Sequence, residues 1–187
     1  AIVDANGEYG AVIVSAANLN IAAHEVAMPE GTSLVLLQNE IPDDVNLAVA
    51  LKAKASGAKV WLNAAPAREI SNGLVEVIDL LIVNKVEAEF YAGAGFALNL
   101  LKTLGAEGVS YNGVQYSGFP VDVVSTHGAG DMFVGALASQ VVCGANMVDA
   151  IKFAQAAAAL HVSSQLDKRK KLNNQATTAF LATQNRR

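Results

Sequence analysis

The chain is poor in cysteine and in charged residues. Its single cysteine, Cys143, excludes an intrachain disulfide and is typical of a reducing compartment. Because Cys143 lies in an apolar run, we expect a buried thiol rather than a nucleophile. Charged residues make up 16% of the chain and the net charge is −4, with one basic run at residues 168–171. Such a run is typical of a solvated surface, so we expect no nucleic-acid partner.

Long apolar runs are also missing. No stretch reaches the ~20 apolar residues that a membrane-spanning helix requires. Together with the cysteine content, this predicts a cytoplasmic protein with no membrane partner.

What the sequence does contain is apolar segments that alternate between strand-like and helix-like patterns. We expect strands at residues 33–38, 59–63, 78–83, 100–104 and 119–124. We expect helices from Pro42 to Gly57, from Asn84, over 129–143, from Asn146 to His161, and over 175–183. This alternation predicts an α/β fold, a mostly parallel sheet with helices on both faces.

Two Asn-Gly pairs predict hairpins, because both turn positions tolerate a positive φ. One pair lies within residues 1–15, at Asn6-Gly7, and the other lies within 109–116, at Asn112-Gly113. We therefore divide the chain into a hairpin over residues 1–15 and an α/β core over 16–187.

The segment from Ser125 to Phe133 carries the strongest chemical signal. Gly128, Ala129 and Gly130 are small, so their backbone N–H groups can approach an anion at the start of the following helix. Asp131 follows directly and can accept a proton. The combination suits phosphoryl transfer to a hydroxyl; the alternative is a tight turn followed by an ordinary acid in the first turn of a helix.

This segment and four others resemble the ribokinase-like sugar kinases, also called the phosphofructokinase B family. The matching blocks, in chain order, are Gln38-Asn39-Glu40, Asn63 to Arg68, Asn84 to Glu89, Thr103 to Gly108, and Thr126 to Phe133. The resemblance covers nearly all of residues 1–163 and implies a ribokinase-like α/β fold. It also implies an ATP-dependent sugar kinase with Mg²⁺ as a second cofactor.

The resemblance assigns the chemistry to the glycine turn. Asp131 would be the base that deprotonates the sugar hydroxyl attacking the γ-phosphate of ATP. Gly128, Ala129 and Gly130 would form the anion hole around the transferred phosphoryl group. Glu40 would hold the hydroxyls of the sugar; the alternative for Glu40 is an acid at the entry of the helix that follows Pro42.

The resemblance also assigns the nucleotide and metal site. Asn84 and Glu87 would serve the Mg²⁺–phosphate network, with Glu87 acting through water, although a helix cap with a first-turn acid explains the same pair. Thr103, Gly105 and Gly108 would contact the nucleotide phosphates and ribose. Gln155 stands near the adenine, where ribokinases tend to have Asn.

Ser125 departs from the family, which usually has Asp at this position. In the family that Asp helps to shape a monovalent-cation site together with backbone carbonyls near His127. Ser125 keeps an oxygen but not the charge, so a K⁺ site at Ser125 and His127 is in question. Residues 163–168 also depart from the Gly-rich segment that the family has there.

The resemblance implies that the family's N-terminal part, with its Gly-Gly-rich sugar-binding loop, is absent. Residues 1–15 would be part of a lid hairpin, through which relatives commonly form homodimers. The link over residues 93–101 is short for a parallel crossover. We therefore expect a fragment, or ordered pieces of a longer chain.

Ribose is the favoured substrate, because residues 38–40 and 63–68 are most similar to ribokinase. The alternatives are a fructose-type or nucleoside kinase of the same family, a nucleotide-binding pseudoenzyme or regulatory module, and a structural fragment without a ligand.

Overall fold

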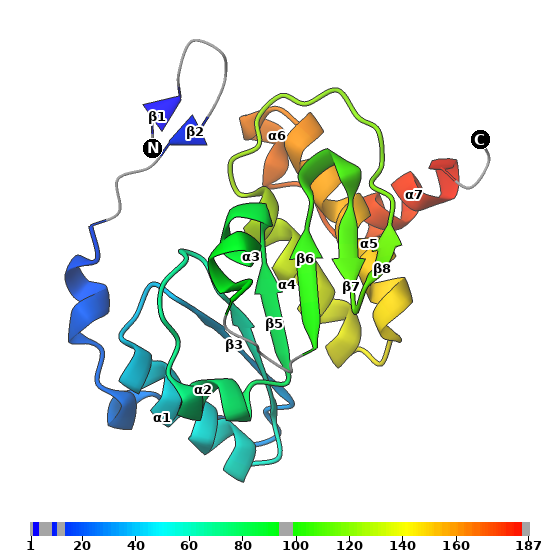
Figure 1. The fold of residues 1–187 in the computed structure, drawn as a ribbon. Coiled ribbons are helices and arrows are strands. Elements are labelled where there is room, and N and C mark those ends of the chain that lie inside the picture. The colour runs from blue at the N-terminus through cyan, green and yellow to red at the C-terminus, as the bar shows by residue number, and fades with distance from the viewer. Residues whose placement is uncertain (1, 4–8, 11–13, 94–98, 185–187) are drawn as a thin grey trace. The chain divides into compact units, whose positions relative to one another are not determined.

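The computed structural model describes residues 2–3, 9–10, 14–93 and 99–184 (Figure 1). The chain divides into two compact units. The sheet unit comprises Val14–Leu104 and Ser110–Gln115, and the helical unit comprises Ala1–Ile13, Gly105–Val109 and Tyr116–Arg187. Among the helices described, none is long and apolar enough to cross a membrane.

Six strands of the described chain form one sheet in sequential order. They are β3 (Leu34–Gln38), β4 (Lys59–Asn63), β5 (Leu80–Val83), β6 (Leu100–Thr103), β7 (Val109–Tyr111) and β8 (Val114–Tyr116). Strands β3 to β6 are parallel, as in the pairing of Leu37 with Leu62. The amide of Asn112, just past β7, donates to the carbonyl of Leu100 at the start of β6 (3.1 Å), so β7 runs antiparallel to β6. The sheet is mostly parallel, as predicted.

Three helices of the sheet unit pack on one face of the parallel strands (Figure 1). They are α1 (Asp43–Ala55), α2 (Asn72–Val77) and α3 (Lys85–Tyr91). Pro42 is the N-terminal cap of α1. The helix ends before Gly57, which has a φ of 82°, so both ends lie where the sequence predicted them. The helices and strands share one buried apolar cluster, which includes Leu37, Val45, Val49, Val60, Leu62, Leu74, Leu81, Val83 and Tyr91.

The central strands are buried on both faces. Val60 and Leu62 of β4 belong to the cluster beneath the helices, whereas Trp61, the sole tryptophan, points to the opposite face and is equally buried. Leu80 and Ile82 of β5 are buried on that opposite face as well. Such continuous apolar strands are typical of parallel sheets.

The described residues also form three 3-10 helices, and a pair of two-residue strands near the start of the chain. The 3-10 helices are η1 (Ala16–Asn20), η2 (Ala23–Glu25) and η3 (Gly105–Glu107), of which η3 belongs to the helical unit. Strand β1 (Ile2–Val3) pairs antiparallel with β2 (Tyr9–Gly10), so a hairpin is present within residues 1–15. Its predicted turn at Asn6-Gly7 lies outside the described residues. Its role as part of a lid stays a prediction.

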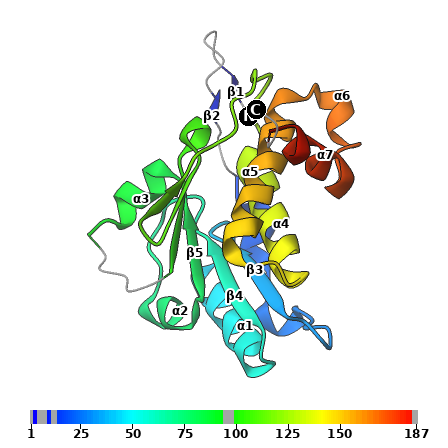
Figure 2. The same cartoon turned by 90° about the vertical axis from the view of Figure 1, so that its right-hand side faces the viewer.

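The helical unit contains α4 (Ala129–Val142), α5 (Met147–Ser163), α6 (Leu166–Arg169) and α7 (Asn174–Gln184). Helices α4 and α5 pack side by side (Figure 2), joined by a short connection. Asn146 caps α5 as predicted, because its side chain accepts a hydrogen bond from the amide of Asp149. Helix α7 packs on α5, and the ring of Phe180 meets Phe119 edge-on, with ring centres 5.5 Å apart.

Two predictions about local structure are wrong. Residues 119–124 form no strand; instead the amides of Val124 and Ser125 donate to the carbonyl of Val162 at the end of α5 (2.8 and 3.1 Å). The backbone at the end of this segment therefore bonds to a helix instead of a neighbouring strand, which a strand-like pattern does not distinguish. Cys143 is exposed, because it is the C-terminal cap of α4.

Candidate active site

Four of the predicted site residues lie at one edge of the sheet. Glu40 follows β3, Asn84 and Glu87 follow β5, and Thr103 ends β6. The carboxyl ends of parallel strands share an edge, which is where ligands of such sheets bind. The hydroxyl of Thr103 donates to the carbonyl of Val83 (3.4 Å), which joins the ends of β5 and β6. A strand was predicted over residues 119–124, directly before Ser125, but Ser125 follows no strand and belongs to the helical unit.

Asn84 and Glu87 form a reciprocal cap at the start of α3. The side-chain oxygen of Asn84 accepts from the amide of Glu87 (2.9 Å). One carboxylate oxygen of Glu87 accepts from the amide of Asn84 (2.7 Å), and the other accepts from its side-chain amide (2.9 Å). Burial raises the pKa of Glu87 above its ordinary value of 4.5, and the hydrogen bond from the Asn84 backbone opposes this shift to a smaller extent.

This pair fits an outer-shell role toward Mg²⁺. Each oxygen of Glu87 accepts one hydrogen bond, and a carboxylate oxygen has two acceptor positions, so each keeps one for a metal-bound water. Mg²⁺ usually retains several waters and binds one or two carboxylates together with substrate phosphates. Among the described residues, no cluster of three or more His, Cys, Asp or Glu could hold a metal alone.

A network around Tyr91 ties the Glu40 loop to α3. Asn39, buried beside the exposed Glu40, donates from its side-chain amide to the carbonyl of Pro66 (3.1 Å) and to the hydroxyl of Tyr91 (3.0 Å). The Tyr91 hydroxyl donates to the carbonyl of Arg68 (2.6 Å) and accepts from its amide (3.3 Å). Burial raises the pKa of Tyr91, so the hydroxyl keeps its proton and its donor role.

Sequence reasoning missed this network, although a signal was available. Tyr91 follows Glu87 by four residues and therefore lies on the same face of α3. The Arg68 guanidinium also donates to the carbonyl of Ile41, next to Glu40. The loops after β3 and β4 and helix α3 are thus connected by hydrogen bonds beneath the sheet edge.

In the helical unit, Gly108 and Gln155 come together. The side-chain amide of Gln155 donates to the carbonyls of Tyr116 (2.9 Å) and Ser117 (3.2 Å). A Cβ on Gly108, which has a φ of 103°, would lie 2.1 Å from the Tyr116 carbonyl oxygen and 2.8 Å from the Gln155 amide nitrogen. Only glycine fits at residue 108. Gly105, with a φ of 64°, is exposed at the start of η3.

The glycine turn leads into α4 as predicted. Gly128 is its N-terminal cap, in the left-handed region with a φ of 74°. The amide of Ala129 donates to the carbonyl of Thr126 (3.1 Å) and is therefore engaged within the turn. No backbone carbonyl of the described chain accepts from the next two amides, of Gly130 and Asp131, which open the helix. The side chain of Asp131 is exposed beside these two donors.

The carbonyls that precede Gly128 contact Arg169, which was not predicted as a site residue. The Arg169 guanidinium donates to the carbonyls of Ser125 (2.8 Å) and His127 (3.0 Å). The ring of His161 also lies against the His127 carbonyl, with Nε2 2.8 Å from the oxygen. Arg169 belongs to the basic run at 168–171, where the sequence pattern favours a solvated surface and gives no sign of this contact.

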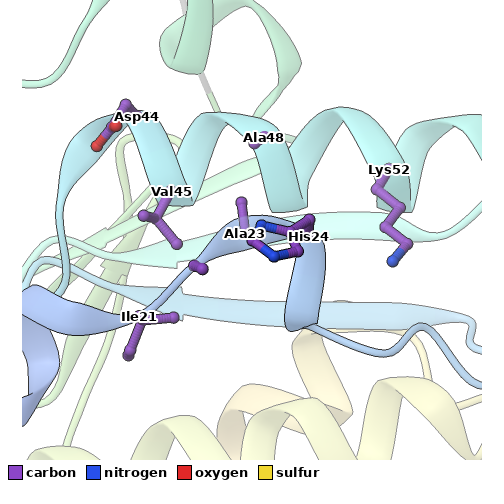
Figure 3. Close-up of a pocket in the computed structure, with 8 residues that line it drawn as sticks. Ile21, Ala23, His24, Asp44, Val45, Ala48 and Lys52 are labelled. Atoms are coloured by element: carbon purple, nitrogen blue, oxygen red, sulfur yellow. The ribbon is translucent and has the colours of Figure 1, made fainter.

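A surface groove of about 560 Å³ lies elsewhere on the sheet unit. Figure 3 shows the residues that line it, among them Val45 and Lys52 of α1 and Ala23 and His24 of the preceding segment. None of the predicted site residues lines this groove, so we assign it no part in the chemistry.

Comparison with known proteins agrees with the motifs. A model described as pfkB family carbohydrate kinase matches residues 1–171. Ribokinase from Haemophilus influenzae is 32% identical over 186 residues, which cover 86% of this chain and 60% of that protein. The chain therefore spans about three fifths of the length of this relative.

Two solved structures share the fold. Ribokinase from Thermotoga maritima superposes with a TM-score of 0.82 at 27% identity, over 96% of this chain and 67% of that one. The structure of Arabidopsis thaliana ribokinase complexed with ribose and ATP superposes with a TM-score of 0.70 at 30% identity. The match covers 79% of this chain and 55% of that one. The predicted ribokinase-like fold is confirmed, and because the family model matches most of its length, the chain belongs to the pfkB family of carbohydrate kinases.

Proposed function

We propose that this protein transfers the γ-phosphoryl group of ATP to a primary hydroxyl of a monosaccharide, with ribose as the favoured substrate. One observation carries the proposal. At the start of α4, the amides of Gly130 and Asp131 are available as donors and an exposed carboxylate, Asp131, lies beside them. Donors for developing charge and a base for a hydroxyl proton are what this reaction requires of a protein.

The proposed step assigns separate tasks to these groups. The carboxylate of Asp131 accepts the proton of the sugar hydroxyl, whose oxygen attacks the γ-phosphorus as the bond to the β-phosphate oxygen breaks and ADP leaves. The amides of Gly130 and Asp131 stabilise the negative charge on the transferred group. Gly128 sets the direction of the helix start. Ala129 contributes through its small size, since its own amide is engaged with Thr126.

The other predicted residues would hold the nucleotide and the metal. Glu87, fixed by Asn84, would accept hydrogen bonds from water on Mg²⁺, which would neutralise phosphate charge. Thr103 and Gly105 would approach the phosphates and ribose of ATP. Gln155 and Gly108 order the segment at Tyr116 and Ser117, which we propose as the wall of the adenine site.

Ribose is favoured because the Haemophilus relative is a ribokinase and the Arabidopsis ribokinase structure holds ribose and ATP. In this chain Glu40 would bind sugar hydroxyls, held in place through Asn39 and the Tyr91 network. We further propose that the enzyme acts in the cytoplasm and forms a homodimer through the β1–β2 hairpin. Light scattering with and without residues 1–13 tests the dimer.

The test is ATP turnover on a panel of ribose, deoxyribose, fructose and nucleosides, with ³¹P NMR to locate the new phosphate ester. We expect ADP and a sugar phosphate on the primary hydroxyl, with ribose giving the highest kcat/KM. A higher kcat/KM for fructose or a nucleoside would assign the alternative substrate class. Binding of ATP without turnover on any member of the panel would refute the proposal in favour of a nucleotide-binding module.

A further inference from the structure

Arg169 differs from the other cations of the basic run. Lys168, Lys170 and Lys171 are exposed, whereas Arg169, at the end of α6, is partly buried. Its guanidinium donates to three backbone carbonyls: from Nη2 to Ser125 (2.8 Å), from Nη1 to His127 (3.0 Å) and from Nε to Ser164 (3.2 Å). Among the residues that the structure describes, no carboxylate forms an ion pair with it. Its hydrogen bonds therefore go to carbonyl oxygens, and Nη1 also lies 3.1 Å from Nε2 of His161.

The carbonyl of His127 accepts a hydrogen bond from Arg169 and lies against the ring of His161. Nε2 of His161 lies 2.8 Å from His127 O and 3.1 Å from Nη1 of Arg169. Because a carbonyl only accepts, the His161 tautomer with its hydrogen on Nε2 donates to His127 O. In that tautomer, together with the bond from Arg169, both lone pairs of this oxygen are engaged. The side-chain oxygen of Ser125 accepts from the amide of His127 (3.3 Å).

These oxygens are the ones expected to hold K⁺. A monovalent cation there would have to displace the guanidinium from the Ser125 and His127 carbonyls or lie beside a like charge. Ser125 supplies no negative charge to offset that repulsion. The residues present at this position therefore do not fit a K⁺ site.

We propose that Arg169 takes the place of the monovalent cation, so that the protein binds no K⁺ at this turn and its phosphoryl transfer is independent of K⁺. Only the second claim, that phosphoryl transfer is independent of K⁺, rests on the proposed function. Ser125 and His127 directly precede Gly128, whose left-handed conformation starts α4. By fixing their carbonyls, Arg169 acts as a positioning residue for the donors of Gly130 and Asp131.

The neighbourhood of Gly128 supports this coupling. A Cβ on Gly128 would lie 3.1 Å from Nε2 of His161, the same atom that contacts the His127 carbonyl and lies 3.1 Å from Nη1 of Arg169. The cation, the imidazole and the turn are therefore packed together. A change at Arg169 should reach the start of α4 within this one cluster.

The experiment compares K⁺, Na⁺ and tetramethylammonium at equal ionic strength, for the wild type, Arg169→Gln, Arg169→Ala and the control Lys170→Ala. Arg169→Gln keeps hydrogen-bond donors but removes the charge. We expect wild-type kcat and Tm to be the same in all three cations, and Lys170→Ala to match the wild type. Arg169→Gln and Arg169→Ala should lose roughly tenfold to a hundredfold in kcat, as small displacements of reacting groups do. Added K⁺ or guanidinium ion should restore part of this loss.

A wild-type kcat or Tm that rises selectively with K⁺ over Na⁺ would overturn the proposal. So would charge-removing variants at residue 169 that behave as Lys170→Ala does. The Tm comparison needs no catalysis, so it tests cation binding even if no sugar is phosphorylated. Absence of turnover in the wild type with every cation and sugar would instead count against the proposed function. If Arg169→Ala does not fold, the Gln variant decides.

Discussion

Helices α3 and α4 both begin with an acid at their third residue, but the two starts are built differently. In α3, Glu87 is 5% exposed and its carboxylate is held by Asn84 at both oxygens. In α4, the cap is Gly128, which has no side chain to offer, and Asp131 is exposed. The helix dipole favours a negative charge at both places. What differs is the set of donors around each carboxylate.

We propose that this difference separates a holding role for Glu87 from a reacting role for Asp131. A carboxylate that accepts hydrogen bonds at both oxygens keeps one geometry, which suits the outer shell of a metal. An exposed carboxylate without a cap partner can turn toward a substrate hydroxyl and accept its proton. Asp149, the third residue of α5, gives a further comparison, because it is exposed but bound to its cap Asn146 (2.7 Å). The following predictions test whether the two starts have these separate roles.

The largest effect is expected from Asp131→Asn. Loss of a general base should lower kcat by roughly a hundredfold to ten-thousandfold, while Tm stays near that of the wild type because the side chain is exposed. The measurement is ADP formation with ribose, together with a thermal melt. The matched control is Asp149→Asn, which should cost at most about 1 kcal/mol of stability and leave kcat unchanged. Equal rates for the wild type and Asp131→Asn would remove Asp131 from its reacting role.

The main effect of Glu87→Gln should be a loss of folding stability. The new NH₂ group must face either the amide or the side-chain amide of Asn84, both of which are donors. A buried donor without an acceptor costs about 1–3 kcal/mol, which urea unfolding measures. The Mg²⁺ concentration for half-maximal activity should also rise. Glu89→Gln, at an exposed position in the same helix, should change neither quantity.

Gly130→Ala and Gly135→Ala form a pair that isolates the start of α4. Both glycines lie in α4, and a Cβ on either would meet nothing within 4 Å. Each substitution should raise helix stability by about 0.5–1 kcal/mol. Only Gly130→Ala places a methyl group beside the two donor amides, so only this variant should lower kcat, by roughly tenfold. The same kcat for both variants would argue against an anion at this turn.

The smallest expected effect is a pH dependence of stability due to Glu87. Burial raises its pKa in the folded state, so the folded protein keeps this proton to a higher pH than the unfolded chain. The free energy of unfolding should therefore decrease as pH rises from 4.5 through the folded pKa. Urea unfolding across this range should show the decrease in the wild type and Glu89→Gln. A decrease of equal size in Glu87→Gln would assign it to another group.

The sequence predicted the bounds of helices and strands correctly where the local pattern agrees with burial. Strand β4 has the predicted bounds, and α1 and α5 begin at the predicted caps, Pro42 and Asn146, because these features depend on neighbours in the chain. Residues 119–124 were mistaken for a strand because their composition is strand-like, whereas the amide of Val124 donates to the end of α5 instead of a neighbouring strand. Helix α2 was missed, since Asn72-Gly73 resembles a turn. In the structure the amide of Leu74 donates to the side chain of Ser71, which caps the helix.

The candidate site shows the same limit. The predicted strands over residues 33–38, 78–83 and 100–104 end beside Glu40, Asn84 and Thr103, as the structure has them. The contacts of Arg169 join residues more than forty positions apart, Ser125 to Arg169, and no spacing rule predicts them. Long-range polar contacts of this kind depend on the packing of whole elements.

The burial of Trp61 has a practical consequence for studying the protein. Trp61 is the only tryptophan and lies in the sheet unit, whereas the only cysteine, the exposed Cys143, lies in the helical unit. Each unit therefore carries one optical reporter without any mutation: indole fluorescence in one, and a thiol-linked dye in the other. Coincident transitions of the two signals in urea would show cooperative unfolding of both units. Separate transitions would give each unit its own midpoint.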